Sequence, residues 1–182
     1  MKKSENQKIV QSYHEYAKTQ NPRVKTQKGV SSGTYGRDFE MQVKNALGLY
    51  NFKGVASANS IDTVIKTKNG KRVKVEIKSR QGTIGTYDEN GNLKSKTLQS
   101  DLIIYAPDYK SGDNVLKSAF VMGSKEFVDG LAESGLLIQT TNTQGYPVLK
   151  IRPLNSNKAV NALWDLCEEI GIDLDKWIKE NR

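Results

Sequence analysis

Apolar and charged positions alternate along residues 61–78. From Arg72 to Lys78 every second residue is apolar, which is the period of a β-strand with one buried face. The preceding run, Ile61–Ile65, is also rich in β-branched residues, and the Lys68-Asn69-Gly70 segment between the two runs is typical of a turn. The pattern therefore predicts a β-hairpin.

The loop length of this hairpin decides which side chains share a face. A two-residue Asn-Gly turn would pair Ile65 with Lys74 and mix apolar with charged side chains. A three-residue loop with Gly70 in a left-handed conformation instead pairs Ile65 with Val73 and keeps the apolar faces together. We therefore expect the three-residue loop.

This register has a chemical consequence for the charged face. It places Asp62 opposite Glu76, with Lys78 one pleat further along the same face. Directly opposed residues have Cβ atoms about 5 Å apart, and two carboxylates that close repel each other unless a cation lies between them. The hairpin therefore predicts a metal site beside a lysine.

Other periodic segments predict helices and strands around this hairpin. Polar and turn-forming residues dominate 81–100, where Asp88–Asn92 predicts a loop tip. Ser124 and Asp173 are expected to cap helices. The expected helices span about 5–19, 37–49, 125–134 and 160–170, with a short last helix after Asp173, and the expected strands span 102–106, 119–122, 136–140 and 147–151. These elements predict an α/β (α+β) fold with a mixed central sheet flanked by helices.

The length of 182 residues suits one domain with a terminal arm. We divide the chain into a basic N-terminal helix and linker over 1–32 and a domain over 33–182, with a C-terminal hairpin and helices over 136–182. The net charge of +8 favours a polyanionic partner, above all nucleic acid, with DNA expected. The candidate phosphate contacts are Arg23, Lys25, Lys28, Arg37, Lys66, Lys68, Lys71, Arg72, Lys74 and Arg80.

Cysteine and histidine usage excludes several classes of site. The single Cys167 excludes a disulfide framework and a cysteine zinc site, and its helical spacing predicts a core thiol. The single His14 has no companion for metal binding.

No apolar run reaches about 18 residues, and the N-terminus does not resemble a signal peptide. We expect a cytoplasmic protein with no membrane partner.

The predicted elements follow one another in a fixed order along the chain. A helix with Glu40 comes first, then the hairpin with Asp62 and Glu76-Ile77-Lys78, then an apolar strand and a further helix. Over roughly residues 33–130, with the core motif at 36–130, this order resembles the PD-(D/E)xK nuclease superfamily. Ile61 stands where the family name has proline. The resemblance implies a restriction-endonuclease-like core in which Asp62 and Glu76 bind Mg²⁺ (or Mn²⁺), Glu40 assists them, and Lys78 positions or activates water.

Three functions remain open from the sequence. The first is a Mg²⁺-dependent DNA endonuclease of prokaryotic or phage origin. The second is a non-enzymatic phage or mobile-element protein on the same fold that binds DNA or a CRISPR effector, such as an anti-CRISPR inhibitor of Cas9. The third is a Holliday-junction resolvase-like homodimer. For Glu40 there is also a structural explanation, since acidic residues stabilise helix N-termini.

Overall fold

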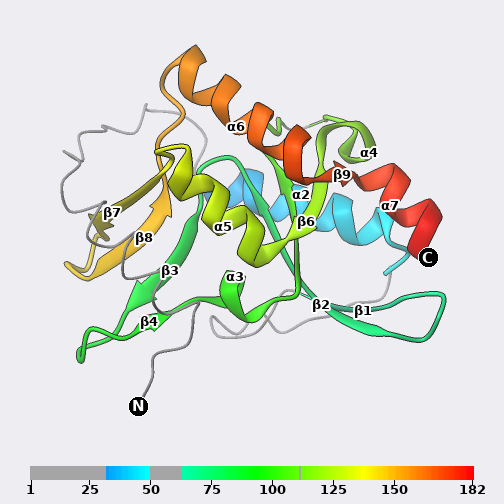
Figure 1. The fold of residues 1–182 in the computed structure, drawn as a ribbon, viewed down its shortest axis with the longest axis horizontal. Helices are drawn as coiled ribbons and strands as arrows, with labels where there is room; N and C mark the ends of the chain where they lie inside the picture. The colour runs from blue at the N-terminus through cyan, green and yellow to red at the C-terminus, as the bar shows by residue number, and fades with distance from the viewer. Residues whose placement is uncertain (1–31, 50–62, 111) are drawn as a thin grey trace.

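The computed structural model describes residues 32–49, 63–110 and 112–182 (Figure 1). The predicted helix over 5–19, the linker residues Arg23, Lys25 and Lys28, and Asp62 lie outside the described residues. Within the described part, two β-sheets are combined with helices, which confirms the α+β class.

The larger sheet, sheet A, has the order β1-β2-β5-β6-β9. Only the β2–β5 pair is parallel, so the sheet is mixed as predicted. Its strands are β1 (Thr63–Lys66), β2 (Arg72–Ser79), β5 (Leu102–Ala106), β6 (Phe120–Gly123) and β9 (Ile172–Asp173). The predicted strands at 102–106 and 119–122 are confirmed as β5 and β6.

The second sheet, sheet B, has the order β4-β3-β8-β7. The predicted C-terminal hairpin is confirmed as β7 (Leu137–Thr141) paired antiparallel with β8 (Pro147–Ile151). No strand or helix was predicted in the polar, turn-rich segment 81–100, but β3 (Thr83–Tyr87), β4 (Leu93–Lys94) and α3 (Lys96–Gln99) form there. The loop tip between β3 and β4 is confirmed, with Asp88 N–H donating to the Asn92 carbonyl at 2.9 Å.

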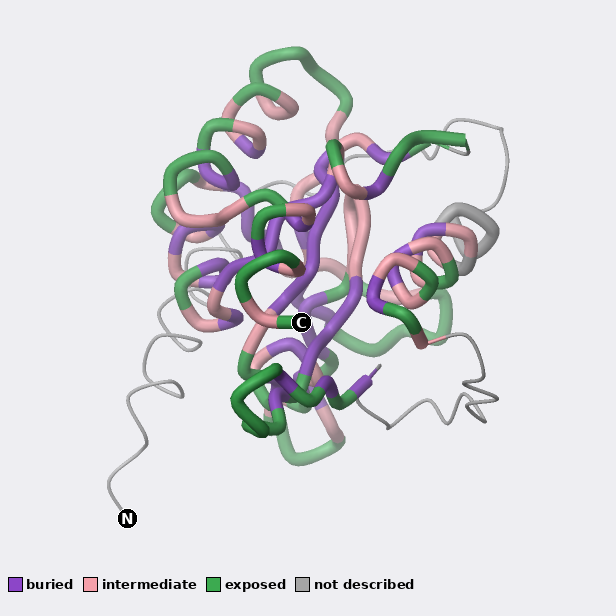
Figure 2. The backbone as a smooth tube through the Cα atoms, turned by 90° about the vertical axis from the view of Figure 1, so that its right-hand side faces the viewer, coloured by how far each residue is buried: buried purple, intermediate pink, exposed green. Residues whose placement is uncertain are grey.

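Helices cover both faces of sheet A (Figure 1). On one face lie α2 (Ser32–Ala46), α4 (Val115–Ser118) and α7 (Leu174–Asn181). On the other lie α3, α5 (Ser124–Glu133), α6 (Asn157–Ile170) and the inner face of sheet B. We call the two layers the α2 core and the α5 core. Figure 2 shows the buried strands of the central sheet between these layers.

The start of α5 corrects one prediction about capping. The N-cap residue is Gly123, and Ser124 is the first residue of the helix, with its side chain buried. Its N–H donates to the Asp101 carbonyl at 3.2 Å. The Glu126 carboxylate folds back over Gly123, where a Cβ would lie 1.8 Å from Oε2. No side chain makes a capping hydrogen bond here, and the Glu126 carboxylate in the first turn favours the helix dipole instead. Asp173 is the N-cap residue of α7 as expected, although its side chain makes no capping hydrogen bond.

The C-terminal residues join α7 to the hairpin and to α2. Arg182 donates from Nη1 to the Lys66 carbonyl at 2.9 Å and from Nη2 to the Leu47 carbonyl at 2.5 Å. Lys68 N–H donates to the Asn181 carbonyl at 2.7 Å. A cation at the end of α2 also favours the helix dipole. The hairpin is therefore held against the body of the protein from one side.

In the described residues, no helix combines the length and the apolar character needed to cross a lipid bilayer.

Burial of two weak acids predicts alkaline destabilisation. Cys167 is buried in the α5 core, as predicted, and burial raises the pKa of its thiol to about 12. Burial also raises the pKa of the Tyr87 hydroxyl to about 12. In the unfolded chain the pKa values are 9.0 for the thiol and 10.0 for the hydroxyl, below those of the folded protein. The contribution of each group to stability is therefore fully present below its unfolded pKa. Above that pKa the unfolded chain loses the proton first, so the free energy of unfolding decreases as the pH rises.

We expect the thiol to reduce stability by about 1.4 kcal/mol per pH unit between its two pKa values. Urea unfolding at pH 8, 9.5 and 10.5 measures this slope. Cys167→Ala should shift the onset of the decline towards pH 10, whatever its effect at pH 8. A wild-type stability that stays level to pH 10.5 would contradict the burial of both groups.

Candidate active site

The β1–β2 hairpin has the loop and register that its sequence predicts. Thr67 N–H donates to the Lys71 carbonyl at 2.8 Å, and Gly70 N–H donates to the Thr67 carbonyl at 2.9 Å. Gly70 has φ +85°, a left-handed conformation that favours glycine. The three-residue loop is therefore confirmed.

The strand pairs above this loop follow the same register. Ile65 pairs with Val73 and Thr63 with Val75, as expected. The next predicted pair joins Asp62 to Glu76. Because Asp62 is outside the described residues, its position opposite Glu76 stays a prediction.

Glu76 is a buried carboxylate on the charged face of β2. It is 4% exposed and lies beside Ile103 of β5, on the face of sheet A opposite to Val75 and Ile77. Its Oε1 is 3.2 Å from Nζ of Lys78, whose side chain is 18% exposed. Removing a carboxylate from water costs several kcal/mol, and the adjacent ammonium offsets part of that cost. The structure thus brings together two of the predicted site residues.

The turn that follows β2 packs against the stem of Lys78. A Cβ at Gly82 would lie 2.7 Å from Cδ of Lys78, so the backbone of Gly82 contacts this stem directly. Tyr105, which lies beside Lys78 on β5, donates its hydroxyl to the Arg80 carbonyl. Arg80 has φ +54°, a conformation that costs a non-glycine residue about 1 kcal/mol.

Gly82 and Tyr105 therefore belong to the surroundings of the site, although sequence reasoning missed both. A glycine four residues after Lys78 was the only local signal for Gly82. Tyr105 reaches the site through the parallel pairing of β2 with β5, which no local pattern shows.

Glu40 lies in the middle of α2 and forms an ion pair with Lys44 one turn later, with Oε1 and Nζ 2.5 Å apart. The Glu40 side chain is 36% exposed. Its neighbour Phe39 and Val43 pack in the α2 core, on the face of sheet A opposite to Glu76. The described residues contain no group of three or more Asp, Glu, His or Cys side chains placed to hold a metal ion. The assisting role of Glu40 stays a prediction.

The hairpin surrounds the Glu76–Lys78 pair with positive charge. Residues 63–80 contain seven Lys or Arg residues and one Glu, a net charge of 7 − 1 = +6. Arg80 is half-buried, and α2 carries Arg37, whose side chain is outside the described part. The predicted phosphate contacts that are exposed are Lys66, Lys68, Lys71, Arg72 and Lys74. Such a field attracts phosphate groups.

A scan against protein-family models finds no match to this chain, and searches of curated proteins and of solved structures find none either. The Glu76 carboxylate is a hard oxygen donor, and Mg²⁺ binds proteins through one or two carboxylates while keeping several waters. The donor type at Glu76 fits Mg²⁺, and Lys78 adds a cation beside it.

Proposed function

We propose that this protein is a Mg²⁺-dependent DNA endonuclease that hydrolyses phosphodiester bonds on a restriction-endonuclease-like core. The observation that carries the proposal is the buried Glu76 carboxylate with the Lys78 ammonium 3.2 Å away, at the inner end of a strongly basic hairpin. The resemblance to PD-(D/E)xK nucleases supports the same two residues.

In this proposal Glu76 and Asp62 hold the metal ion. Mg²⁺ neutralises charge on the scissile phosphate and lowers the pKa of water, and Mn²⁺ is expected to substitute for it. Lys78 orients the attacking water and stabilises the negative charge that develops on the phosphate. Gly82 and Tyr105 keep the stem of Lys78 in place, through the contacts on that stem and on the Arg80 carbonyl.

Stability alone does not explain why the buried pair of Glu76 and Lys78 is charged. Replacing a buried ion pair by apolar residues of similar volume is often neutral or stabilising. The neighbouring positions of β5, Ile103 and Tyr105, are buried in the α5 core, so an apolar pair at 76 and 78 could have joined that core. A charged pair kept at the edge of a core supports a functional role.

The test is a cleavage assay on supercoiled plasmid, linear duplex and a four-way junction, with Mg²⁺, Mn²⁺ or EDTA. We expect nicking with either metal and none in EDTA. Glu76→Gln and Asp62→Asn should each reduce cleavage to the EDTA level. Lys158→Gln, at an exposed position on α6, serves as the matched control and should keep wild-type activity.

The substrate panel also separates the alternatives. Symmetric nicks confined to the four-way junction would favour a resolvase-like dimer over a general endonuclease. Folded wild-type protein that binds DNA but cuts none of these substrates would overturn the proposal and favour the non-enzymatic counter-defence protein. Thermal unfolding of each variant shows whether lost cleavage reflects lost folding.

A further inference from the structure

We propose that the open face of the β1–β2 hairpin binds the backbone of duplex DNA, independently of sequence, and leads it to Glu76 and Lys78. We call this surface the hairpin track; it consists of Val64, Lys66, Arg72 and Lys74. Its delivery role rests on the proposed function, because it names the substrate form that the same site would take. Its binding role can be measured without any cleavage.

The hairpin track is the open side of a two-stranded ribbon. β5 pairs with residues 75–79 of β2, and Asp101, just before β5, exchanges hydrogen bonds with the backbone of Lys74. In the described part of the chain, the Lys66–Arg72 pair beyond it has no third strand beside it. The other face of the ribbon is closed, since Ile65 is buried in the α2 core. The hairpin extends beyond the central sheet in Figure 1.

The ribbon is also held in place from behind. Arg182 donates to the Lys66 carbonyl, and Lys68 N–H donates to the Asn181 carbonyl, so α7 supports the strand that carries half of the track. A supported ribbon loses little conformational freedom when a ligand binds to its open side.

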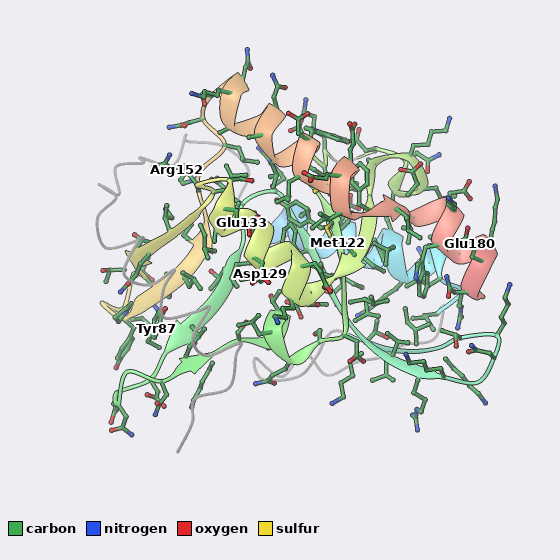
Figure 3. All side chains as sticks on the ribbon, in the orientation of Figure 1. Tyr87, Met122, Asp129, Glu133, Arg152 and Glu180 are labelled. Atoms are coloured by element: carbon green, nitrogen blue, oxygen red, sulfur yellow. The ribbon has the colours of Figure 1, made fainter. Side chains whose placement is uncertain are left out.

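Positive charges outnumber negative ones on the hairpin track, where the Asp101 carboxylate accepts from the Lys74 backbone N–H at 2.9 Å. Lys66 and Arg72 lie directly opposite each other, where like charges destabilise a strand pair. Among the described residues, no ion pair involves Lys66, Arg72, Lys74 or the loop lysines Lys68 and Lys71. Figure 3 shows side chains projecting from both strands of the hairpin. A polyanion along this face would remove the repulsion.

The residue types favour duplex over single-stranded nucleic acid. Proteins that bind single strands without sequence preference stack bases on aromatic side chains, and residues 63–78 contain none. Val64, which is 47% exposed, is the one apolar side chain of the track. Lysine and arginine side chains can contact the phosphates of any duplex, and such contacts fix position but read no sequence.

The hairpin track is continuous with the candidate active site. Arg72, Lys74, Glu76 and Lys78 are alternate residues of β2 and therefore share one face. With about 3.3 Å of rise per residue, Lys74 and Glu76 are about 7 Å apart along the strand. Exposure falls along this row, from exposed Arg72 and Lys74 to buried Glu76. A backbone bound to the first two residues would bring a phosphate to the pair that follows.

The test measures binding of a fluorescent 20-base-pair duplex by anisotropy, in EDTA, across 50–300 mM NaCl. For Lys66→Gln/Arg72→Gln we expect the slope of log affinity against log salt to become shallower by about 1.8, because each lost phosphate contact contributes about 0.9. The affinity at 100 mM NaCl should fall at least about tenfold. The control Lys117→Gln/Lys158→Gln removes two exposed cations elsewhere and should keep the wild-type slope.

Four outcomes would overturn the hairpin track. They are an unchanged slope in the hairpin variant, an equal loss in the control, tighter binding of the matching single strand, and binding of an acidic polyglutamate peptide but not of duplex. Urea unfolding of both variants shows whether folding is retained. A changed slope in a wild-type protein that never cleaves DNA would support the track and defeat only the proposed function.

Discussion

Lys78→Met should lower the free energy of unfolding at pH 7 by about 3–5 kcal/mol. The substitution keeps a similar stem but removes the ammonium 3.2 Å from Glu76, and the buried carboxylate loses that compensating charge. Breaking a buried ion pair from one side has costs of this size, far above those of a surface pair. Urea denaturation monitored by circular dichroism measures the difference.

The matched variant is Glu76→Gln/Lys78→Met, which removes both charges. We expect it to be more stable than Lys78→Met, with a coupling energy of about 1–3 kcal/mol between the two positions. On the proposed function, the double variant regains stability while remaining unable to cleave DNA. If Lys78→Met cost less than about 1 kcal/mol and the two effects simply added, the pair would be solvated and would not form a buried site.

Phe39→Ala should lower the free energy of unfolding by about 3–5 kcal/mol. Phe39 is 0% exposed in the α2 core, and its ring centroid lies 5.0 Å from that of Tyr109. Its removal would leave a cavity between α2 and sheet A and would end this aromatic contact. The hydroxyl of Tyr109 donates to Asp38, so the same helical turn would also lose support for a polar contact.

The matched control is Met41→Ala on the same helix. Met41 is 55% exposed, so its truncation should change stability by no more than about 0.5 kcal/mol. Equal effects of the two substitutions on stability would show that α2 does not pack through Phe39.

Local patterns predicted the elements whose apolar residues repeat regularly. The hairpin loop followed from Gly70 and from the need to keep Ile65 and Val73 on one face, and the structure has that loop and register. The strands β5, β6, β7 and β8 and the helices α5 and α6 were predicted for the same reason. Their ends differ from the predictions by a few residues, since helix and strand termini depend on contacts outside the element.

Elements that depend on distant partners were missed. β3 pairs with β8 more than 60 residues later along the chain, and Gly85 and Thr86 within β3 interrupt its apolar pattern. α4 and β9 are too short to show a period. The Gly123 cap of α5 was missed because Ser124 is a better capping residue by type, whereas the contact of Glu126 with Gly123 is visible only in the folded chain.

The sequence by itself determined the two faces of the hairpin and its register, because alternation and turn chemistry act between close neighbours. It placed Glu76 and Lys78 on one charged face together with Arg72 and Lys74. Only the tertiary structure decided which of these charges are buried. β5 pairs with the second half of β2 and leaves the first half open, so Glu76 enters the protein interior while Arg72 and Lys74 remain in water.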